Sequence, residues 1–348
     1  MKAVIFSGKD SLDLVDIKKP NIQDDDILVK IKACAVCGTD LRVFKHGHFK
    51  IGKHEKRVLG HELTGEIIDK GSNVKKYKRG WGVTIAPNIG CGQCEMCLLG
   101  FNNLCPDYEA FGISLDGGFQ EYMRVPSYAI NAGNIFKIPG NIDFTTATLI
   151  EPLSCCFHSY TELKTKHTDS VLIIGAGPIG ALHLFINKLA GASPIVVADI
   201  SDTRLEMMKE FGADITINAN KLDLSEEVNK VTNGKGIDVI IIACSVPQYQ
   251  NTALFLASRR GRINYFAGLS ENTKNVTINT NMIHYKELKV LATTGSRHSD
   301  FYQAIKIVEK NGDLLDRLIS KTFPIEKTLE AFKFSDSGNG MKSVVVFE

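Results

Sequence analysis

The segment VLIIGAGPIGALHLFINKL (171–189) constrains the fold more than any other part of the sequence. Its four opening apolar residues are typical of a parallel strand that is buried on both faces. The glycine-rich turn that follows leads into an apolar helical pattern. Two further apolar runs, GIDVIIIACS (236–245) and GRINYFAGL (261–269), continue the alternation of strand and helix. We therefore predict an α/β fold with a doubly wound domain over residues 156–289.

The turn GAGPIG within this segment has the spacing of a dinucleotide-binding site. Gly175 makes the tight turn, Gly177 lets the backbone approach a pyrophosphate, and Gly180 lets helix and strand pack closely. Pro178 and Ile179 lie at the start of the helix, whose N-terminus offers free N–H groups and positive potential to phosphates. A glycine triplet alone is a weak signal, but its position between an apolar strand and a helix supports this interpretation.

Asp199 ends the next predicted strand, 24 residues after Gly175. A carboxylate there accepts hydrogen bonds from both ribose hydroxyls and repels a 2′-phosphate, so we expect NAD rather than NADP as the cofactor. Arg204 follows five residues later and is a candidate to stack on the adenine or to meet a phosphate. The alternative is a helix-capping aspartate and a surface arginine.

Length and charge exclude several classes of protein. The 348 residues are too many for one ordinary core, so two domains are expected. The chain has 41 basic and 39 acidic residues, a balance that favours neither nucleic acid nor a membrane surface as a partner. The sequence has no apolar core of a signal peptide and no uncharged apolar run of about 18 residues, which predicts a cytoplasmic protein.

Four cysteines lie within fifteen positions, in CGQCEMCLLGFNNLC (91–105). In a reducing compartment such a cluster favours metal binding over disulfides. Thiolates at this spacing can converge on one ion at about 2.3 Å, and four of them leave no place for substrate. The pattern predicts a structural zinc site formed by Cys91, Cys94, Cys97 and Cys105. A redox or iron–sulfur centre is the alternative.

Residues 1 to about 150 read as short strands with turns, and the tail after the doubly wound segment is a candidate to return to this first domain. ILVKIKAC (27–34), LTGEII (63–68) and WGVTIAP (81–87) are β-rich pieces. TTATLIEPLSCCFHSYTEL (145–163) has a helical pattern despite Pro152. The tail after 290 predicts one helix and a final strand, KSVVVFE.

A second candidate metal site is scattered over three segments. KACAVCGTD carries Cys37, VLGHELTGE carries His61 and Glu62, and LIEPLSCC carries Glu151. Each residue alone has an ordinary structural explanation, although a carboxylate inside an apolar stretch needs a partner.

Together these pieces resemble the zinc-containing medium-chain alcohol dehydrogenases, and the likeness covers nearly the whole chain. The matching motifs are CGTD (37–40), GHE (60–62), the four-cysteine lobe, DGGFQEY (116–122) and GAGPIG (175–180), in the order of the family. IEPLS (150–154) and VADISDTRLE (197–206) resemble the sorbitol and polyol dehydrogenase branch. The resemblance implies a GroES-like, β-rich catalytic domain, residues 1–155 with 290–348 and a zinc lobe near 88–108, beside a Rossmann NAD-binding domain, residues 156–289.

By the same resemblance, Cys37 and His61 are ligands of a catalytic zinc, and Glu62 and Glu151 are the candidates for the remaining positions. Which glutamate binds at rest stays open. With the lobe, the chain would hold two zinc ions. An open position on a catalytic zinc activates an alcohol, which then passes a hydride to the nicotinamide.

The resemblance also suggests roles for residues near these ligands. Thr39 is placed to take the alcohol proton. The family passes this proton to a histidine at the position of Arg42, and arginine cannot accept it. His46 matches a histidine of the polyol branch and is a candidate cleft residue, with a surface position as the alternative. Arg297 is a candidate substrate contact. The basic run at 45–57 is a solvated loop or a region that attracts a phosphorylated substrate.

These observations predict a zinc-dependent, NAD-linked dehydrogenase that oxidises a secondary alcohol of a polyol or sugar derivative. The alternatives within the class are a polyol-phosphate, threonine or simple alcohol dehydrogenase. A non-catalytic NAD-binding redox sensor is the alternative from another class. The expected partner is a small alcohol or polyol substrate, and a homo-oligomer, tetramer or dimer, is expected from the relatives.

Overall fold

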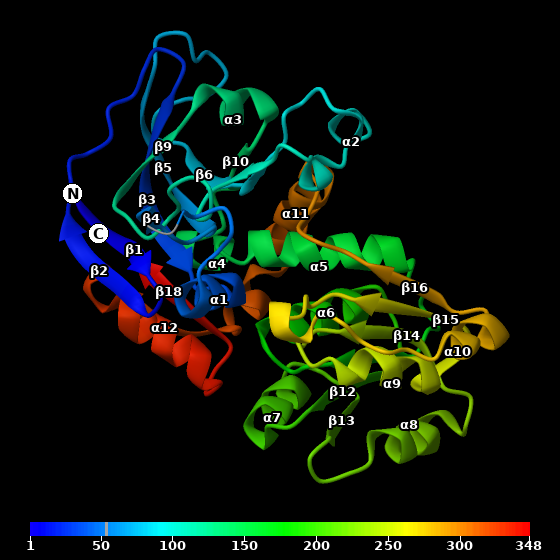
Figure 1. Cartoon of the computed structure of the whole chain (residues 1–348). Coiled ribbons are helices and arrows are strands. Elements are labelled where there is room, and N and C mark those ends of the chain that lie inside the picture. The colour runs from blue at the N-terminus through cyan, green and yellow to red at the C-terminus, as the bar shows by residue number, and fades with distance from the viewer. Residues whose placement is uncertain (53–54) are drawn as a thin grey trace. The chain divides into compact units, whose positions relative to one another are not determined.

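The computed structural model describes residues 1–52 and 55–348, and the chain forms two compact units. Unit 1 comprises residues 1–154 and 295–348, and unit 2 comprises residues 155–294. Among the described residues, no helix combines the length and the apolar character that a membrane span requires. Figure 1 shows the elements of both units in the order of the sequence.

Unit 1 is rich in β-structure. A three-stranded antiparallel sheet has the order β2-β1-β4, with β1 (Lys2–Gly8), β2 (Ser11–Asp16) and β4 (Arg57–Val58). A separate two-stranded sheet in the four-cysteine lobe pairs β7 (Asn88–Ile89) with β8 (Glu109–Ala110). The main sheet has seven strands in the order β10-β6-β5-β3-β18-β17, with β9 also on β3. They are β3 (Ile27–Ala35), β5 (Glu62–Lys70), β6 (Gly82–Ile85), β9 (Tyr122–Val125), β10 (Ile135–Lys137), β17 (Ile319–Pro324) and β18 (Lys342–Val346).

The helices of unit 1 are mostly short. They are α1 (Gly38–His46), α2 (Glu95–Leu98), α3 (Ser127–Ala132), α4 (Phe144–Ala147), α5 (Ile150–Leu163), which continues into unit 2, α11 (His298–Asp316) and α12 (Thr328–Ser337), with 3₁₀ turns η1 (Asn102–Leu104) and η3 (Ile325–Lys327). Pro152 is tolerated in α5 because it lies in the first turn, where backbone N–H groups have no partner within the helix.

Unit 2 is an α/β unit around one parallel sheet of order β13-β12-β11-β14-β15-β16. Its strands are β11 (Val171–Ile174), β12 (Ile195–Asp199), β13 (Ile215–Asn218), β14 (Ile237–Ile242), β15 (Ala257–Tyr265) and β16 (Lys289–Ala292). Its helices are α6 (Pro178–Leu189), α7 (Asp202–Glu210), α8 (Leu224–Thr232), α9 (Gln248–Leu256) and α10 (Thr280–Lys286), with a 3₁₀ turn η2 (Glu271–Thr273). The expected doubly wound fold class is confirmed.

Strand order reverses in unit 2 between β11 and β14, and the glycine-rich turn lies at that point. Gly175 has φ of +112°, a conformation that favours glycine. A Cβ on Gly180 would lie 1.9 Å from the carbonyl oxygen of Gly175, so α6 can approach the turn this closely only with glycine there. The turn therefore presents the N-terminus of α6 at the carboxyl edge of the sheet, where dinucleotides bind in such folds.

His183 is a polar residue in the apolar interior of unit 2. It lies on α6, is fully buried, and packs edge-on against Phe266 with ring centroids 4.6 Å apart. Neither ring nitrogen has a hydrogen-bond partner among the described residues. Burial lowers the pKa of His183 to about 3, because a charged imidazolium would lose its hydration there. The folded state therefore holds this ring neutral.

This burial predicts a loss of stability in acid. Because the pKa of His183 is lower in the folded than in the unfolded chain, protonation favours unfolding as the pH falls below about 6.5. By pH 5 the cost should reach about 2 kcal/mol, and His183→Leu should remove that part of the pH dependence. Urea unfolding of the full chain at pH 7 and pH 5 measures this loss of unfolding free energy. The exposed His167→Leu serves as control and should follow the unmodified protein; equal pH dependence in all three would contradict the assignment.

Candidate functional site

Three potential metal ligands from two segments of unit 1 come together. Cys37 precedes α1, His61 precedes β5, and Glu62 is the first residue of β5. Their ligand atoms all lie within 4.8 Å of one another, and both His61 and Glu62 are buried. A thiol, an imidazole and a carboxylate in this arrangement are a donor set that suits zinc.

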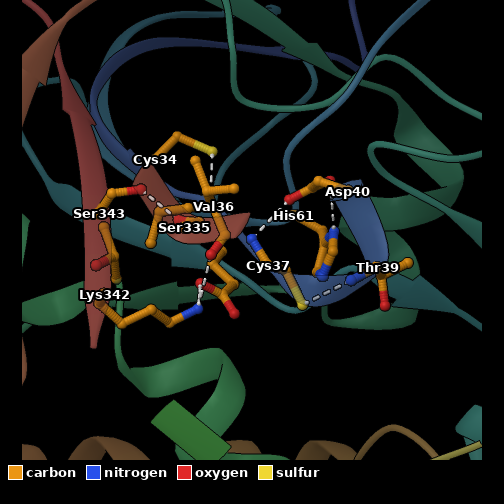
Figure 2. A network of polar contacts seen from close by, with 12 residues as sticks. Cys34, Val36, Cys37, Thr39, Asp40, His61, Ser335, Lys342 and Ser343 are labelled. Carbon is orange, nitrogen blue, oxygen red and sulfur yellow. Dashed lines mark hydrogen bonds and ion pairs between the residues drawn. The ribbon is translucent and has the colours of Figure 1, made fainter. Parts of the chain in front are cut away.

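Cys37 is the N-cap of α1, and its sulfur takes part in the capping hydrogen bonds. Its Sγ accepts a hydrogen bond from the backbone N–H of Thr39 at 3.5 Å, as Figure 2 shows. In return, the carboxylate of Asp40 accepts one from the N–H of Cys37 at 2.9 Å. These two bonds fix the position of the sulfur at the start of the helix.

Asp40 orients His61. The two side chains face each other in Figure 2, with Nδ1 of His61 3.4 Å from Oδ1 of Asp40. Burial opposes a charge on the ring, but the negative charges of Asp40 and Cys37 outweigh it and raise the pKa of His61 well above its ordinary value. The surrounding negative charges thus favour a positive charge on this ring, and a carboxylate behind a histidine is a common support for a metal ligand. Asp40 lies in the CGTD motif, but we did not predict this role.

The motif DGGFQEY (116–122) fixes the backbone of the three residues that precede His61 in the sequence. The N–H groups of Gly117, Gly118 and Phe119 donate to the carbonyls of Val58, Gly60 and Leu59 at 2.7 to 3.1 Å. A Cβ on Gly117 would lie 2.0 Å from the carbonyl oxygen of Gly60, so only glycine permits this contact. The motif therefore positions a candidate ligand without contributing one itself.

Glu62 forms a buried ion pair with Lys342, which lies on β18, 280 residues later in the sequence. Both side chains are almost fully buried, and the ammonium also donates to the carbonyl of Val36 at 3.2 Å. Burial alone would lower the pKa of Lys342, but the charge of Glu62 raises it. Oε2 of Glu62 contacts Lys342, whereas Oε1 has no hydrogen-bond partner among the described residues. This second oxygen is free to bind a cation.

Glu151 lies close by, but outside the group of three. It is in the first turn of α5, buried, and its charge also raises the pKa of Lys342. The sequence left open which glutamate binds a metal at rest. The geometry brings Glu62 together with Cys37 and His61. The role of Glu151 stays a prediction.

The lobe brings its four cysteines together as well. The sulfur atoms of Cys91, Cys94, Cys97 and Cys105 lie within 4.8 Å of one another. The N–H of Cys91 donates to the sulfur of Cys105 at 3.3 Å, and the N–H of Cys94 donates to that of Cys91 at 3.4 Å.

The charge of these sulfurs explains why a cation fits the lobe. Backbone N–H groups of Gln93 and Cys94 lower the pKa of Cys91 to about 7, whereas burial raises the pKa of Cys97 to about 12 and also raises that of Cys105. Four thiolates at this separation repel one another unless a metal ion neutralises them. The lobe therefore has the chemistry of a closed metal site.

The predicted cofactor residues gather around the glycine turn of unit 2. Gly177 is the N-cap of α6, and Pro178 is its first residue. The carboxylate of Asp199 accepts hydrogen bonds from the N–H groups of Ala176, Ile200 and Ser201 at 2.6 to 2.9 Å. These bonds hold the carboxylate at the carboxyl end of β12, beside the turn.

Arg204 reaches the same turn. Its Nη1 lies 3.9 Å from the place where a Cβ on Gly177 would be. The predicted grouping of glycine turn, acid and arginine is thus present in the geometry of unit 2.

The remaining predicted site residues are not among these groups of ligands, although Thr39 is next to one of them through its N–H bond to Cys37. Thr39 and exposed Arg42 are on α1, and His46 is its last residue. Arg297 precedes α11, pairs with both carboxylate oxygens of Asp300 at 2.8 and 2.9 Å, and lies over the ring of Phe101 in the lobe at 5.5 Å. These contacts connect the lobe to α11. Substrate contact by Arg297 stays a prediction.

Known protein families match both parts of the chain. Residues 23–139 match the alcohol dehydrogenase GroES-like domain, and residues 178–310 match the zinc-binding dehydrogenases. Three similar proteins are a D-arabitol-phosphate dehydrogenase of Enterococcus avium (31% identity, 97% of this chain and 94% of the relative), an L-threonine 3-dehydrogenase of Bacillus velezensis (31%, 96% and 94%) and a sorbitol dehydrogenase of Bacillus subtilis (30%, 96% and 93%).

Solved structures are similar over the whole chain. One is an Escherichia coli protein described as a short chain alcohol dehydrogenase, in complex with NADH (TM-score 0.90, 29% identity, 100% of this chain and 99% of the other). Another, from Sinorhizobium meliloti, is assigned as a zinc-binding dehydrogenase and was solved with NADP (TM-score 0.90, 29%, 99% of each chain). The class defined by fold and site is that of the metal-binding, two-unit dehydrogenases. The chain belongs to the zinc-containing medium-chain alcohol dehydrogenase family, as its motifs predicted.

Removing Lys342 should destabilise unit 1. Lys342→Met leaves the carboxylate of Glu62 buried without its partner, which should cost about 3 to 5 kcal/mol of unfolding free energy. Lys45→Met is the matched control, because its half-exposed pair with Asp336 should contribute about 1 kcal/mol or less.

Urea unfolding measures both variants. Adding Glu62→Gln to Lys342→Met should recover much of the loss, because the unpaired charge is gone. A Lys342→Met protein as stable as the Lys45→Met control would show that the pair does not hold the site together.

Proposed function

We propose that this protein is a zinc-dependent, NAD-linked dehydrogenase that oxidises a secondary alcohol of a polyol or sugar derivative. The grouping of Cys37, His61 and Glu62 carries the proposal, because it offers a metal three ligands of the kind found in catalytic zinc sites. Membership of the alcohol dehydrogenase family supports the same reaction.

Zinc at this site would supply a Lewis acid that lowers the pKa of an alcohol. The chain supplies the rest. Asp40 keeps His61 oriented, and Lys342 holds one oxygen of Glu62 while leaving the other available. Thr39 is the proposed acceptor of the alcohol proton. Since Arg42 cannot take a proton near neutral pH, the proton leaves to water rather than along a protein relay.

NAD is the proposed cofactor, bound by the glycine turn with Asp199 on the adenosine ribose. The carboxylate is already fixed by three backbone N–H groups, so it cannot easily turn away from a 2′-phosphate. The negative carboxylate of Asp199 would repel the negative 2′-phosphate of NADP, which disfavours binding of NADP. Solved relatives hold NADH in one case and NADP in the other, so the choice depends on residues such as this one.

Asp199→Ala should shift the preference toward NADP. The change removes both the repulsion and the ribose hydrogen bonds, and it leaves Arg204 to meet the phosphate, so the ratio of kcat/KM values for NAD and NADP should fall at least about tenfold. Steady-state kinetics with both cofactors gives the ratio. Equal use of NAD and NADP by the unmodified protein would refute the role of Asp199.

Two zinc ions per chain are expected after gentle purification, one at each group of ligands. Mild chelation should remove the ion of Cys37, His61 and Glu62 first, because four thiolates enclose the other. Metal analysis during dialysis against a chelator measures the order of loss. Cys94→Ser should lose the lobe ion and lower stability, whereas Cys244→Ser, outside both groups, should keep two ions. Full activity with one zinc or none would overturn the two-site proposal.

The substrate follows from the relatives and from the carboxylate ligand. Curated relatives act on sorbitol, arabitol phosphate and threonine at similar identity, so a panel of these compounds with ethanol is the decisive experiment. We expect reduction of NAD with polyols such as sorbitol or xylitol, or with their phosphates, far faster than with ethanol. Glu62→Ala and Glu151→Ala should each reduce kcat strongly if both glutamates serve the metal.

Each outcome of this panel selects one alternative. Rapid oxidation of threonine or ethanol with no polyol activity would reject the polyol proposal and retain the family. Binding of NAD without oxidation of any alcohol by the zinc-loaded protein would instead support a redox sensor.

A further inference from the structure

A cavity of about 380 Å³ opens in unit 1 at the C-terminal end of α1, and no residue of either group of metal ligands lines it. It lies between the end of β1 and the loop that follows α1. Its lining is Phe6, Gly8, Lys9, His46, Gly47, His48, Phe49, Ile51, Gly52 and Glu55. The volume suits a small molecule or part of one, and the mixture of aromatic and basic side chains is typical of a ligand site.

Three cationic or basic side chains at this cavity lack partners. Lys9 and His46 line it, and Arg42 lies close enough to affect the pKa of His48. Within residues 1–52 and 55–348, the side chains of these three residues make no hydrogen bond or ion pair with another residue. Other cations nearby are engaged: Lys45 pairs with Asp336, and Lys50 binds the carbonyl and ring of Tyr108.

His48 adds an N–H donor. Its Nδ1 accepts a hydrogen bond from the backbone N–H of Lys50 at 3.2 Å. The neutral ring therefore carries its proton on Nε2. Burial and the nearby charges of Lys50 and Arg42 lower the pKa of His48, which favours this neutral form. Phe49 stacks on the ring with centroids 4.5 Å apart and fixes its orientation.

The negative groups around the cavity are mostly compensated. Glu55 lines it, but its carboxylate pairs with Arg57 and accepts the N–H of Gly52 at 3.1 Å. The last carbonyls of α1 carry partial negative charge, which Lys45 and His46 in the last turn offset. Among the lining residues that the structure describes, the uncompensated charges are therefore positive.

Helix α1 connects this cavity to the metal ligands. Thr39, Arg42 and His46 are spaced three and four residues apart, so they lie on one face of the helix. From Thr39 to His46 the axis rises about 10 Å, and helical side chains lean toward the N-terminus, which shortens the span. An extended five- or six-carbon chain with a terminal phosphate is of similar length.

We propose that Lys9, Arg42, His46 and His48 form a site for a phosphate monoester, the phosphate of a polyol-phosphate substrate whose reacting hydroxyl lies at Cys37 and Thr39. This inference rests on the proposed function and narrows its substrate class. The buried Phe6 and Ile51 exclude water on one side of the anion, which strengthens the charge-assisted hydrogen bonds to it.

The test compares the KM values of sorbitol 6-phosphate and sorbitol for the zinc-loaded full chain. Inorganic phosphate alone serves as the probe for binding at the cavity. We expect a KM for the phosphorylated compound at least about tenfold lower, and Lys9→Met combined with His48→Leu should remove most of that difference. Lys45→Met is the matched control. It removes a lysine from the last turn of α1, next to His46, that pairs with Asp336 outside the cavity, and it should keep the ratio of the two KM values. Inorganic phosphate should compete with sorbitol 6-phosphate, and calorimetry should show its binding weakened by Lys9→Met.

The remaining outcomes separate the possible sources of the phosphate. Phosphate binding that depends on Lys9 but does not compete with any substrate would support the anion site and assign it to a separate phosphorylated effector. Equal KM values for both compounds, with phosphate binding insensitive to Lys9 and His48, would overturn the site. Should the protein oxidise no polyol at all, the calorimetric result still decides on the cavity, so this failure is distinct from failure of the proposed function.

Discussion

The candidate site of unit 1 depends on a buried pair of opposite charges, Glu62 and Lys342. Sheet register brings them together, because Val344 on β18 lies beside Ala35 on β3, and Ala35 lies beside Glu62 on β5. Each charge would be costly to bury alone. The pair thus fixes the three strands on which the site is built, and it leaves one carboxylate oxygen of Glu62 without a hydrogen-bond partner among the described residues.

Local motifs made much of the fold predictable. The glycine turn of GAGPIG determines its own geometry over six residues, because Gly175 needs positive φ and Gly180 touches a backbone oxygen. The four cysteines of the lobe are close in sequence and are close in space for that reason. Strands such as β14 were recognisable from unbroken apolar runs, although β15 begins at Ala257, four residues before its predicted start, because the polar residues Ser258–Arg260 also join the strand.

Long-range contacts were not predictable from the sequence. Lys342 opens an apolar strand and looks like an ordinary boundary residue until its partner 280 positions away is known. Asp40 stands in a motif, but its contact with His61 depends on how α1 meets the segment before β5. The basic run at 45–57 was visible as charge alone. Lys53 and His54 of this run lie outside the described residues. For the other side chains, only the fold shows which are already paired and which line a cavity.

The interruption of unit 1 by unit 2 has a consequence for biosynthesis. Unit 2 is one continuous stretch with its own six-stranded sheet, so everything it needs emerges from the ribosome together. Unit 1 begins first but lacks β17 and β18 until unit 2 has been made. During that interval β3 has an open edge and Glu62 has no ammonium beside it. The nascent chain must therefore keep its metal-binding half soluble and unfinished while its cofactor-binding half is already able to fold.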